Sequence, residues 1–375
     1  MSATAEAPPA APERRRWSRG NGITVEPRVR APLALQALVS AGSVLGALLV
    51  AAALLAASGN APLSVYESMV DSSFGTPLAF SQTLIQATPL ILTSLAAAVA
   101  YRMRIWTIGA DGQFLIGAVA ASGIALKLGA DAPALVVIVA SLAAGALGGA
   151  AWAAIAGAGR GYLRTNEVIS TLMLNFIALG FVSYLIFGSG SFWRDPTSAT
   201  QPLGKPIATN AQLPGLFEFA DIGILLAVGV AVLAWAALRW TRWAFELRVV
   251  GSAPRAARYA GIDVPRKILS VMCASGALAG VAGAIVVCNV TEALDPRGLD
   301  PGLGYGYTGI VVAALARLSV VGIVPVAILV AALLSAGPAL ELTGVPNAVV
   351  VVLQGLILLL VAAGQFFLVY RVRRV

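Results

Sequence analysis

Charged side chains in this chain are gathered into clumps, and the long stretches between the clumps contain none. These charge-free stretches are 31–66, 72–101, 132–159, 168–193, 222–238, 268–291, 301–316, 318–340 and 342–370. A membrane-spanning helix needs about 20 consecutive apolar residues, and most of the stretches are that long. Only 11% of all residues are charged, whereas an ordinary soluble domain has roughly a quarter. The sequence therefore predicts an all-α, polytopic membrane protein.

The residue inventory excludes several chemistries. The chain has no histidine, so neither Ser–His–Asp hydrolysis nor a His-ligated metal site is expected. No lysine stands in a G-x-x-x-x-G-K-[ST] loop, so ATP is not expected to bind this chain in that way. Cys273 and Cys288 would lie about 22 Å apart on one helix, too far for a disulfide. We expect no catalytic residue, no metal and no cofactor on this chain.

The charge clumps predict which side of the membrane each connection faces. With 105–126 included, the proposed spans are about 33–57, 78–100, 105–126, 133–157, 166–188, 221–240, 267–290, 303–316, 321–337 and 347–369. If the N-terminus lies inside, 21 of the 25 Lys and Arg residues fall on the cytoplasmic side. This asymmetry follows the positive-inside rule for an even number of spans. It predicts about ten transmembrane helices and two cytoplasmic termini, and it explains the net charge of +8 without a nucleic-acid partner.

Two segments differ in composition from the apolar stretches. Residues 1–32 are Pro/Ala-rich and then basic, so we expect a disordered cytoplasmic tail before the transmembrane domain at 33–370. A cleaved signal peptide would have an apolar core of about 7–15 residues, and the longer run at 33–57 favours a retained first span. The outer loop 188–220 is long and Pro-rich, and we expect it to contact an extracytoplasmic partner.

Glycine clusters interrupt one apolar stretch in each half of the chain. They are Gly109, Gly112 and Gly117 in the first half, and Gly302, Gly304, Gly306 and Gly309 in the second. Broken segments at matching places in two halves point to inverted repeats with a transport pathway between them. Close helix packing through small residues explains the clusters equally well, so both interpretations stay open.

The inner connection 241–266 contains the most informative short segment. Ser252 suits the N-cap of a helix, Pro254 its first turn and Gly261 the position just past its end, which predicts a helix of about two turns. So short a helix is unstable alone in water. We expect it either to dock into a groove of a partner or to lie on the membrane surface.

Four motifs resemble one transporter family. The segment G-S-A-P-R-A-A-R-Y-A-G-I at 251–262 resembles the coupling loop of ABC importer permeases of the sugar/nucleoside/branched-chain amino acid superfamily, whose form is close to G-x-N-P-x-A-A-x-Y-A-G-I. I-G-A-D-G-Q at 108–113 resembles the N-I-G-A-E-G-Q signature of the nucleoside-type branch, 165–175 its third motif, and 276–284 also fits. The resemblance covers roughly 80–370. The departures from the usual Asn, Asn and Glu are Ala253, Thr107 and Asp111.

The resemblance implies a permease subunit of an ATP-driven importer in the bacterial plasma membrane, and not an enzyme. It implies a separate ATP-binding subunit, a second permease that is often a paralogue, and an extracytoplasmic substrate-binding protein, besides membrane lipid. ATP would be held by the partner subunit. The residues that would couple to the ATPase are Gly251, Pro254, Ala256, Ala257, Tyr259, Ala260 and Gly261. A bulky residue at Ala257 is then expected to uncouple transport.

Polar residues within the apolar stretches form a candidate substrate pathway. They are Gln82, Gln86, Asp111, Gln113, Glu167, Thr171, Asn175, Tyr305 and Tyr307. Glu167, Thr171 and Asn175 recur at every fourth position and so share one helix face. Such stripes either line a pore or join helices. Amide groups offer donors and acceptors to a neutral solute such as a nucleobase, and tyrosines offer a stacking face, whereas the nucleoside preference comes from the resemblance.

Several alternatives stay open at this point. Asp111 and Glu167 are costly inside a membrane, so each serves either function or structure. The same machine with a simple sugar, a vitamin or an amino acid as its solute is a second interpretation of the motifs. An ATP-independent transporter or channel is a third, and it would need a coupling-ion site and no docking loop.

Overall fold

The computed structural model describes residues 17–19, 23–27, 32–57, 59–188, 190–198, 203–217, 220–295, 299, 304–342 and 348–374. These fall into two compact units. The smaller unit combines both ends of the chain, residues 1–62 and 352–375, and the larger unit is 63–351. Each unit is described by itself.

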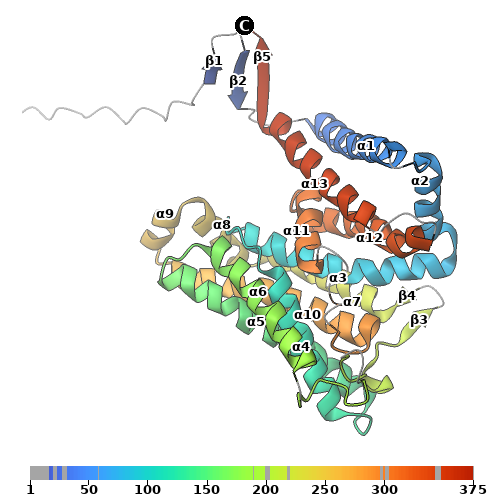
Figure 1. Ribbon diagram of the computed structural model, residues 1–375. Helices are drawn as coiled ribbons and strands as arrows, with labels where there is room; N and C mark the ends of the chain where they lie inside the picture. Colours follow the sequence, from blue (N-terminus) through green and yellow to red (C-terminus); the bar gives the residue numbers. More distant parts are fainter. Residues whose placement is uncertain are drawn as a thin grey trace, which may run out of the picture. The chain divides into compact units, whose positions relative to one another are not determined.

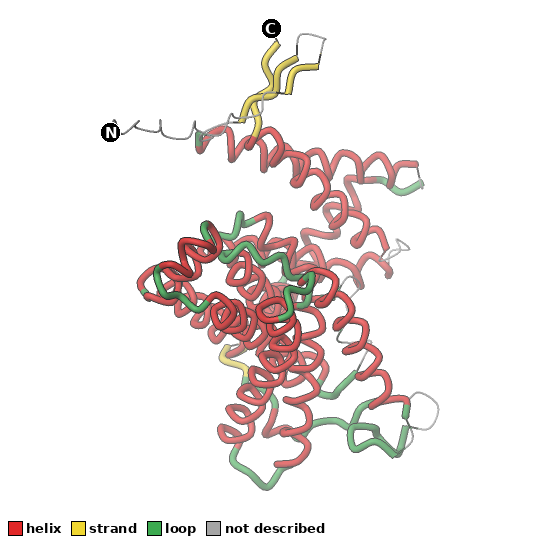
Figure 2. Tube along the Cα trace, turned by 90° about the vertical axis from the view of Figure 1, so that its left-hand side faces the viewer, coloured by secondary structure: helices red, strands yellow, loops and turns green. Residues whose placement is uncertain are grey.

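The smaller unit contains two long helices and a three-stranded sheet. The helices are α1 (Leu33–Ala57) and α13 (Ala348–Val369). The strands β1 (Trp17–Arg19), β2 (Ile23–Pro27) and β5 (Tyr370–Arg374) pair antiparallel in the order β1-β2-β5, and lie side by side in Figures 1 and 2. Because β2 pairs with β5, the described ends of the chain lie together, on the same side of α1 and α13.

This sheet differs from the expectation of a tail without structure at 1–32. Strands β1 and β2 occupy part of that segment, and their partner β5 lies at the other end of the chain, with Ile23 opposite Arg374. Strand formation here depends on a pairing between segments far apart in sequence, which the composition of the tail does not reveal.

The larger unit is a helical bundle. Its long helices are α3 (Pro77–Tyr101), α4 (Ala110–Leu128), α5 (Ala134–Tyr162), α6 (Glu167–Phe187), α7 (Ile222–Trp240), α10 (Val264–Val286) and α12 (Val320–Leu342). Shorter elements are α2 (Pro62–Val70), a π-helical turn (Asp71–Gly75), a 3-10 turn (Thr209–Ala211), β3 (Gly215–Phe217), β4 (Ala220–Asp221), α8 (Arg242–Ser252), α9 (Pro254–Tyr259), a second π-helical turn (Val287–Thr291) and α11 (Tyr305–Leu315).

All ten predicted spans coincide with helices, which confirms the fold class. Within the described residues, seven helices are long and apolar enough to cross a membrane. The stretch Ala41–Ala57 of α1 and the helix α11 count as shorter apolar helices. The helices α2 and α8 and the short strands are elements that the sequence did not predict.

A seam of glycines holds the centre of the larger unit together. Gly145 and Gly149 on α5 face Gly276 and Gly280 on α10, and a Cβ atom added at any of the four would overlap backbone of the other helix. Pairs of glycines four residues apart let two membrane helices approach to backbone contact. Helix α10 also packs against α3 and α4, so these four helices form the core of the unit.

The two ends of the larger unit carry different connections. Helices α8 and α9 lie at one end of the bundle, and the strands β3 and β4 lie at the other (Figure 1). This separation matches the predicted topology, in which the connection 241–266 and the loop 188–220 face opposite sides of the membrane.

Candidate substrate pathway and coupling helix

The helices α4 and α11 begin beside one another, at the two glycine clusters. The backbone N–H of Gly306 donates to Asp111 Oδ1 at 3.2 Å, and a Cβ at Gly306 would overlap the backbone of Asp111. The 11 residues of α11 span about 16 Å, half of a hydrocarbon core of about 30 Å. Helix α11 alone is therefore too short to cross the membrane, and one carboxylate lies at the positive N-terminal ends of both helices.

Asn175 on α6 ties the start of α4 to α11. Its Oδ1 accepts from the backbone N–H of Gly112 at 2.9 Å, and its Nδ2 donates to Ile108 O and to the Tyr307 hydroxyl, each at 2.9 Å. The side chain is only 4% exposed. These bonds satisfy both ends of the amide, so Asn175 joins three elements of the bundle.

Tyr305 connects the start of α11 to α3. Its hydroxyl donates to Gln86 Oε1 at 2.9 Å, and its ring centroid lies 5.4 Å from that of Phe114 on α4. Tyr305 is 1% exposed. The broken start of α11 is thus held from two sides, by α3 through Gln86 and by α6 through Asn175.

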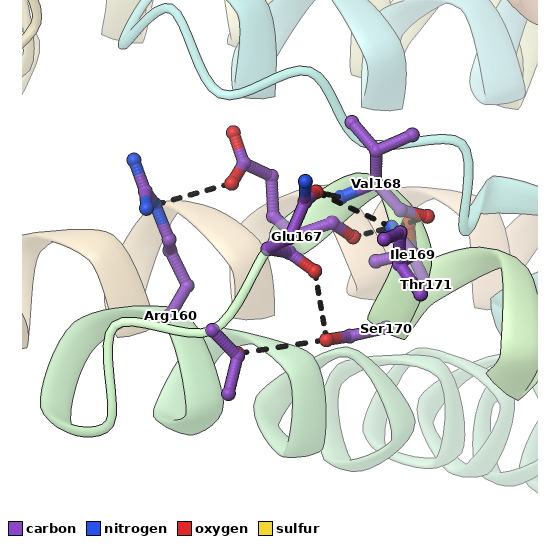
Figure 3. Close-up of polar contacts among 8 residues, drawn as sticks. Arg160, Glu167, Val168, Ile169, Ser170 and Thr171 are labelled. Carbon is purple, nitrogen blue, oxygen red and sulfur yellow. Dashed lines mark hydrogen bonds and ion pairs between the residues drawn. The ribbon is translucent and has the colours of Figure 1, made fainter.

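Thr171 and Glu167 continue the polar face of α6 toward the N-terminal start of the helix (Figure 3). The Thr171 hydroxyl accepts from Ile108 N at 3.3 Å and donates to Glu167 O at 2.7 Å. The Glu167 carboxylate forms an ion pair of 3.2 Å with Arg160 at the end of α5, and Asn166 caps α6. This ion pair with Arg160 favours a structural role for Glu167.

The two remaining glutamines of the predicted pathway differ from the rest. Gln82 lies one turn before Gln86 on an exposed part of α3, and no hydrogen bond within the described residues joins it to the network. Gln113 is 2% exposed, and within the described part of the chain its Oε1 has no hydrogen-bond partner. Gln113 therefore holds the one buried acceptor of this set that the described residues leave unused.

We call the connected residues Gln86, Asp111, Thr171, Asn175, Tyr305 and Tyr307 the hub. Most of the hydrogen-bonding groups that the hub displays are engaged within the protein, which is the helix-joining role of such stripes. A lining role for the hub stays a prediction. Among the described residues, no group of three or more Cys, Asp or Glu side chains comes together in a way that could hold a metal ion.

The predicted two-turn helix in 241–266 is α9. Pro254 occupies its first turn, as the sequence predicts, and Gly261 follows its end with φ of +75°. The N–H groups of Gly261 and Ile262 donate to Arg258 O and Ala257 O, each at 3.0 Å, which is the Schellman arrangement that a left-handed glycine permits. Backbone hydrogen bonds thus fix both the end of α9 and the direction in which the chain leaves it.

The prediction of Ser252 as the N-cap is wrong. Ser252 ends α8, and its hydroxyl donates back to Arg248 O at 2.8 Å. The N-cap of α9 is Ala253, which has no side-chain oxygen to offer. The first turn is instead started by Pro254, whose fixed φ suits a helix and whose missing N–H needs no partner.

The two faces of α9 differ sharply in exposure. Ala257 is fully buried and faces the rest of the protein, whereas Tyr259 is 94% exposed. Of the predicted coupling residues, Pro254, Ala256, Tyr259, Ala260 and Gly261 are exposed, and Gly251 lies against the backbone of Met103. A bulky residue at Ala257 would lift α9 from its seat, so the outward-facing Tyr259 is the sharper probe of a partner.

Residues 79–362 match the family described as the branched-chain amino acid transport system permease component. The chain belongs to this permease family. The match includes both the hub and α9. It confirms the resemblance that the four motifs carry, and it identifies the chain as a membrane-spanning permease subunit.

Individual relatives of the permease are named for different solutes. A glucose ABC transporter permease of Haloferax volcanii is 31% identical over 360 residues, which cover 93% of each chain. A guanosine ABC transporter permease of Bacillus subtilis is 32% identical and covers 84% of this chain and 89% of its own. A nucleoside ABC transporter permease of Lactococcus lactis is 31% identical, with 84% and 87% covered. No solved structure matches the permease.

The helix α8 was missed by the sequence reasoning, and it anchors α9. Glu246 on α8 accepts hydrogen bonds from Lys267 on α10 and from Arg242, the latter at 3.0 Å. These contacts, with the Lys267 hydrogen bond first, lower the pKa of the Glu246 carboxyl. Trp243 Nε1 also donates to Ser270 Oγ at 3.1 Å. The opposite charges of Arg242 and Glu246 four residues apart were the sequence signal for this helix.

The described part of the outer loop is folded against the opposite end of the permease. Trp193 Nε1 donates to Ser122 Oγ at 3.1 Å, and Asn210 Nδ2 donates to the carbonyls of Gly129 and Ala132. Phe192 is 47% exposed and lies 5.2 Å from Lys205 Nζ. The loop is therefore anchored to α4 and α5 while it presents an aromatic side chain outward.

Proposed function

We propose that this permease imports nucleosides across the plasma membrane, driven by ATP hydrolysis on a separate subunit that docks on α9. The guanosine and nucleoside permeases among its relatives, at 31–32% identity over most of each chain, support the solute class. A second permease and an extracytoplasmic binding protein complete the proposed machine.

The exposed face of α9 is the single observation that carries the coupling role. Arg255, Arg258 and Tyr259 point outward from a helix whose end is fixed by Gly261. An aromatic side chain that is 94% exposed, with two arginines beside it, suits a groove on a partner better than open water. The ATPase would press on α9, and the ion pairs of Glu246 would pass that displacement to α10.

The orientation of the permease follows from its basic residues. Both termini lie in the cytoplasm in this proposal, because 21 of the 25 Lys and Arg residues then face inward. The pairing of β2 with β5 supports an even number of crossings. The ATPase therefore meets α9 from the cytoplasm, and the binding protein meets the loop 188–220 from outside.

Gln113 is the residue that we propose contacts the solute. Its buried Oε1 has no partner in the described part of the chain, and its Nε2 lies close to Gly109 at the start of α4. An unused acceptor at a broken helix start suits an N–H group of a nucleobase or a ribose hydroxyl. Gln113 is thus a candidate ligand group beside the hub, whose members hold the helices together.

Uptake in a deletion strain tests the solute class. Loss of this permease should abolish uptake of labelled guanosine, adenosine or uridine and leave glucose uptake unchanged, and the restored gene should recover it. The glucose permease that covers 93% of both chains makes a sugar the second candidate. Loss of glucose uptake with normal nucleoside uptake would replace the proposal with that candidate.

Tyr259→Ala tests the coupling role. We expect this variant to reach the membrane at the normal level and to lose nearly all ATP-driven uptake, because the docking side chain is gone while Ala257 keeps α9 seated. The matched control is Tyr162→Ala, another exposed tyrosine at the end of a helix, which is 57% exposed. Normal uptake by Tyr259→Ala, or equal loss in the control, would contradict docking on α9.

A further inference from the structure

A cavity of about 540 Å³ opens at the end of the bundle where α3, α7, α8 and α12 meet. Four arginines line it, one from each neighbouring segment: Arg102, Arg239, Arg248 and Arg317. The rest of its wall is aromatic or aliphatic apart from Ser319, and consists of Tyr101, Trp235, Leu238, Leu318, Val320 and Val321. Neither Asp nor Glu belongs to the lining, so the cavity combines concentrated positive charge with an apolar wall.

Three of the four cavity arginines have no acidic partner among the described residues. In the described part of the chain, Arg102, Arg239 and Arg248 take part in none of the ion pairs, which instead involve Arg160, Arg242, Arg266 and Lys267. The Arg102 Nε is buried and has no hydrogen-bond partner there. Like charges gathered around a concave surface focus a positive potential that attracts an anion.

The turn that supplies Arg317 has a backbone conformation that side chains disfavour. Arg317 and Leu318 follow one another with φ of +54° and +58°, in the left-handed region where a Cβ meets the neighbouring carbonyl. Two such residues in succession persist only where the surroundings hold them, and they gather at functional sites. The conformation brings both the charge of Arg317 and the apolar side chain of Leu318 to the cavity.

The cavity lies where membrane helices end. Tyr101 is the last residue of α3, Arg239 lies in the last turn of α7, and Val320 begins α12. Val321 in the lining is 67% exposed, and Trp240, whose ring packs against that of Trp235, is 70% exposed. Aromatic and arginine side chains at helix ends mark the level of the lipid headgroups. By the predicted topology this is the cytoplasmic leaflet, where anionic lipids meet basic pockets between helices.

We propose that this cavity binds an anionic glycerophospholipid of the inner leaflet. The phosphate would take the arginine charges, with Arg guanidinium groups donating to its oxygens, and the start of an acyl chain would lie along Leu318, Val320 and Val321. The apolar wall favours a lipid over a free phosphate ion. Because Arg248 belongs to α8, the bound lipid would also tie the anchor of α9 to the ends of α3 and α12.

Native mass spectrometry of the complete transporter tests this site. Complexes would be purified into detergent with equal amounts of phosphatidylglycerol and phosphatidylcholine, and retained lipid would be counted. We expect Arg102→Gln/Arg317→Gln to retain about tenfold less phosphatidylglycerol than the wild type, with phosphatidylcholine unchanged. The control Arg104→Gln/Arg164→Gln removes the same charge from two exposed arginines outside the cavity, and should stay within about twofold of the wild type.

A second variant distinguishes loss of lipid at this site from a general effect of charge and from misfolding. Val321→Trp leaves all four arginines in place and fills the cavity from its apolar wall, so it should also lower phosphatidylglycerol retention. Millimolar glycerol phosphate should fail to displace the lipid. Equal retention in the wild type and the double variant, an equal loss in the control, or full displacement by glycerol phosphate would each overturn the proposal. The proposal would also fail if the ATPase covered the cavity, so that the wild-type transporter retained no more phosphatidylglycerol than the double variant.

Discussion

Removing the Asn175 side chain should loosen the start of α4 and of α11 together. Asn175→Ala deletes three hydrogen bonds, each 2.9 Å long, in a site that is 4% exposed. Side-chain hydrogen bonds between membrane helices contribute about 0.6 kcal/mol each on average, which gives about 2 kcal/mol. The buried Gly112 N–H loses its acceptor and raises the cost further, since an unsatisfied buried group costs about 1–3 kcal/mol. We expect a total loss of about 3–5 kcal/mol.

Reversible unfolding of the purified permease in mixed micelles measures this loss. The matched control is Ser141→Ala on α5, because Ser141 is a fully buried polar residue whose Oγ has no hydrogen-bond partner in the described part of the chain. That variant should change the free energy of unfolding by less than about 0.5 kcal/mol. Wild-type stability of Asn175→Ala, or an equal loss in Ser141→Ala, would refute the assignment of Asn175 as the tie between α4, α6 and α11.

Three further outcomes follow from the same structure. Gly280→Val should destabilise the permease by more than about 3 kcal/mol in the same unfolding assay, because its side chain would overlap the backbone of α5; normal stability would argue against the seam. Gln113→Leu should raise the KM for guanosine uptake and leave stability unchanged, and an unaltered KM would remove Gln113 from the solute site. Lys267 holds the pKa of Glu246 below its ordinary value of 4.5, so the stability that this pair adds is present above pH 4.5 and lost as the pH falls below it. After correction for the intrinsic pH dependence of exchange, the protection factors of the α8 amides should therefore fall on acidification in the wild type and fall less in Glu246→Gln, and equal pH dependence in both would contradict this role.

The spans could be predicted from the sequence because charge and membrane thickness decide them. The run from Leu33 to Ala57 is bounded by polar or basic residues on both sides, and a helix is the structure that satisfies its backbone within lipid. The limits of α9 were also largely predictable, since Pro254 and Gly261 act through their own backbone geometry. In these cases local chemistry is sufficient.

The rest depends on contacts between segments far apart in the chain. Spacing places Thr171 and Asn175 on one face of α6, but their partners Ile108 and Tyr307 are set by how α4 and α11 start. In the same way, the burial of Ala257 depends on contacts of α9 with α8 and α10. The alanines of α9 look alike in the sequence, but Ala257 is buried and Ala256 and Ala260 are exposed. The sheet of β1, β2 and β5 was missed because its strands come from both ends of the chain.

The glycine seam between α5 and α10 limits how this molecule can move during transport. Two helices in backbone contact have no side chains between them that could change rotamer, so they cannot slide or part gradually without losing the whole interface. Helices α5 and α10 must then travel as a single rigid block. The movements that alternate outward and inward access must then occur at interfaces lined by longer side chains, above all where α4 and α11 begin.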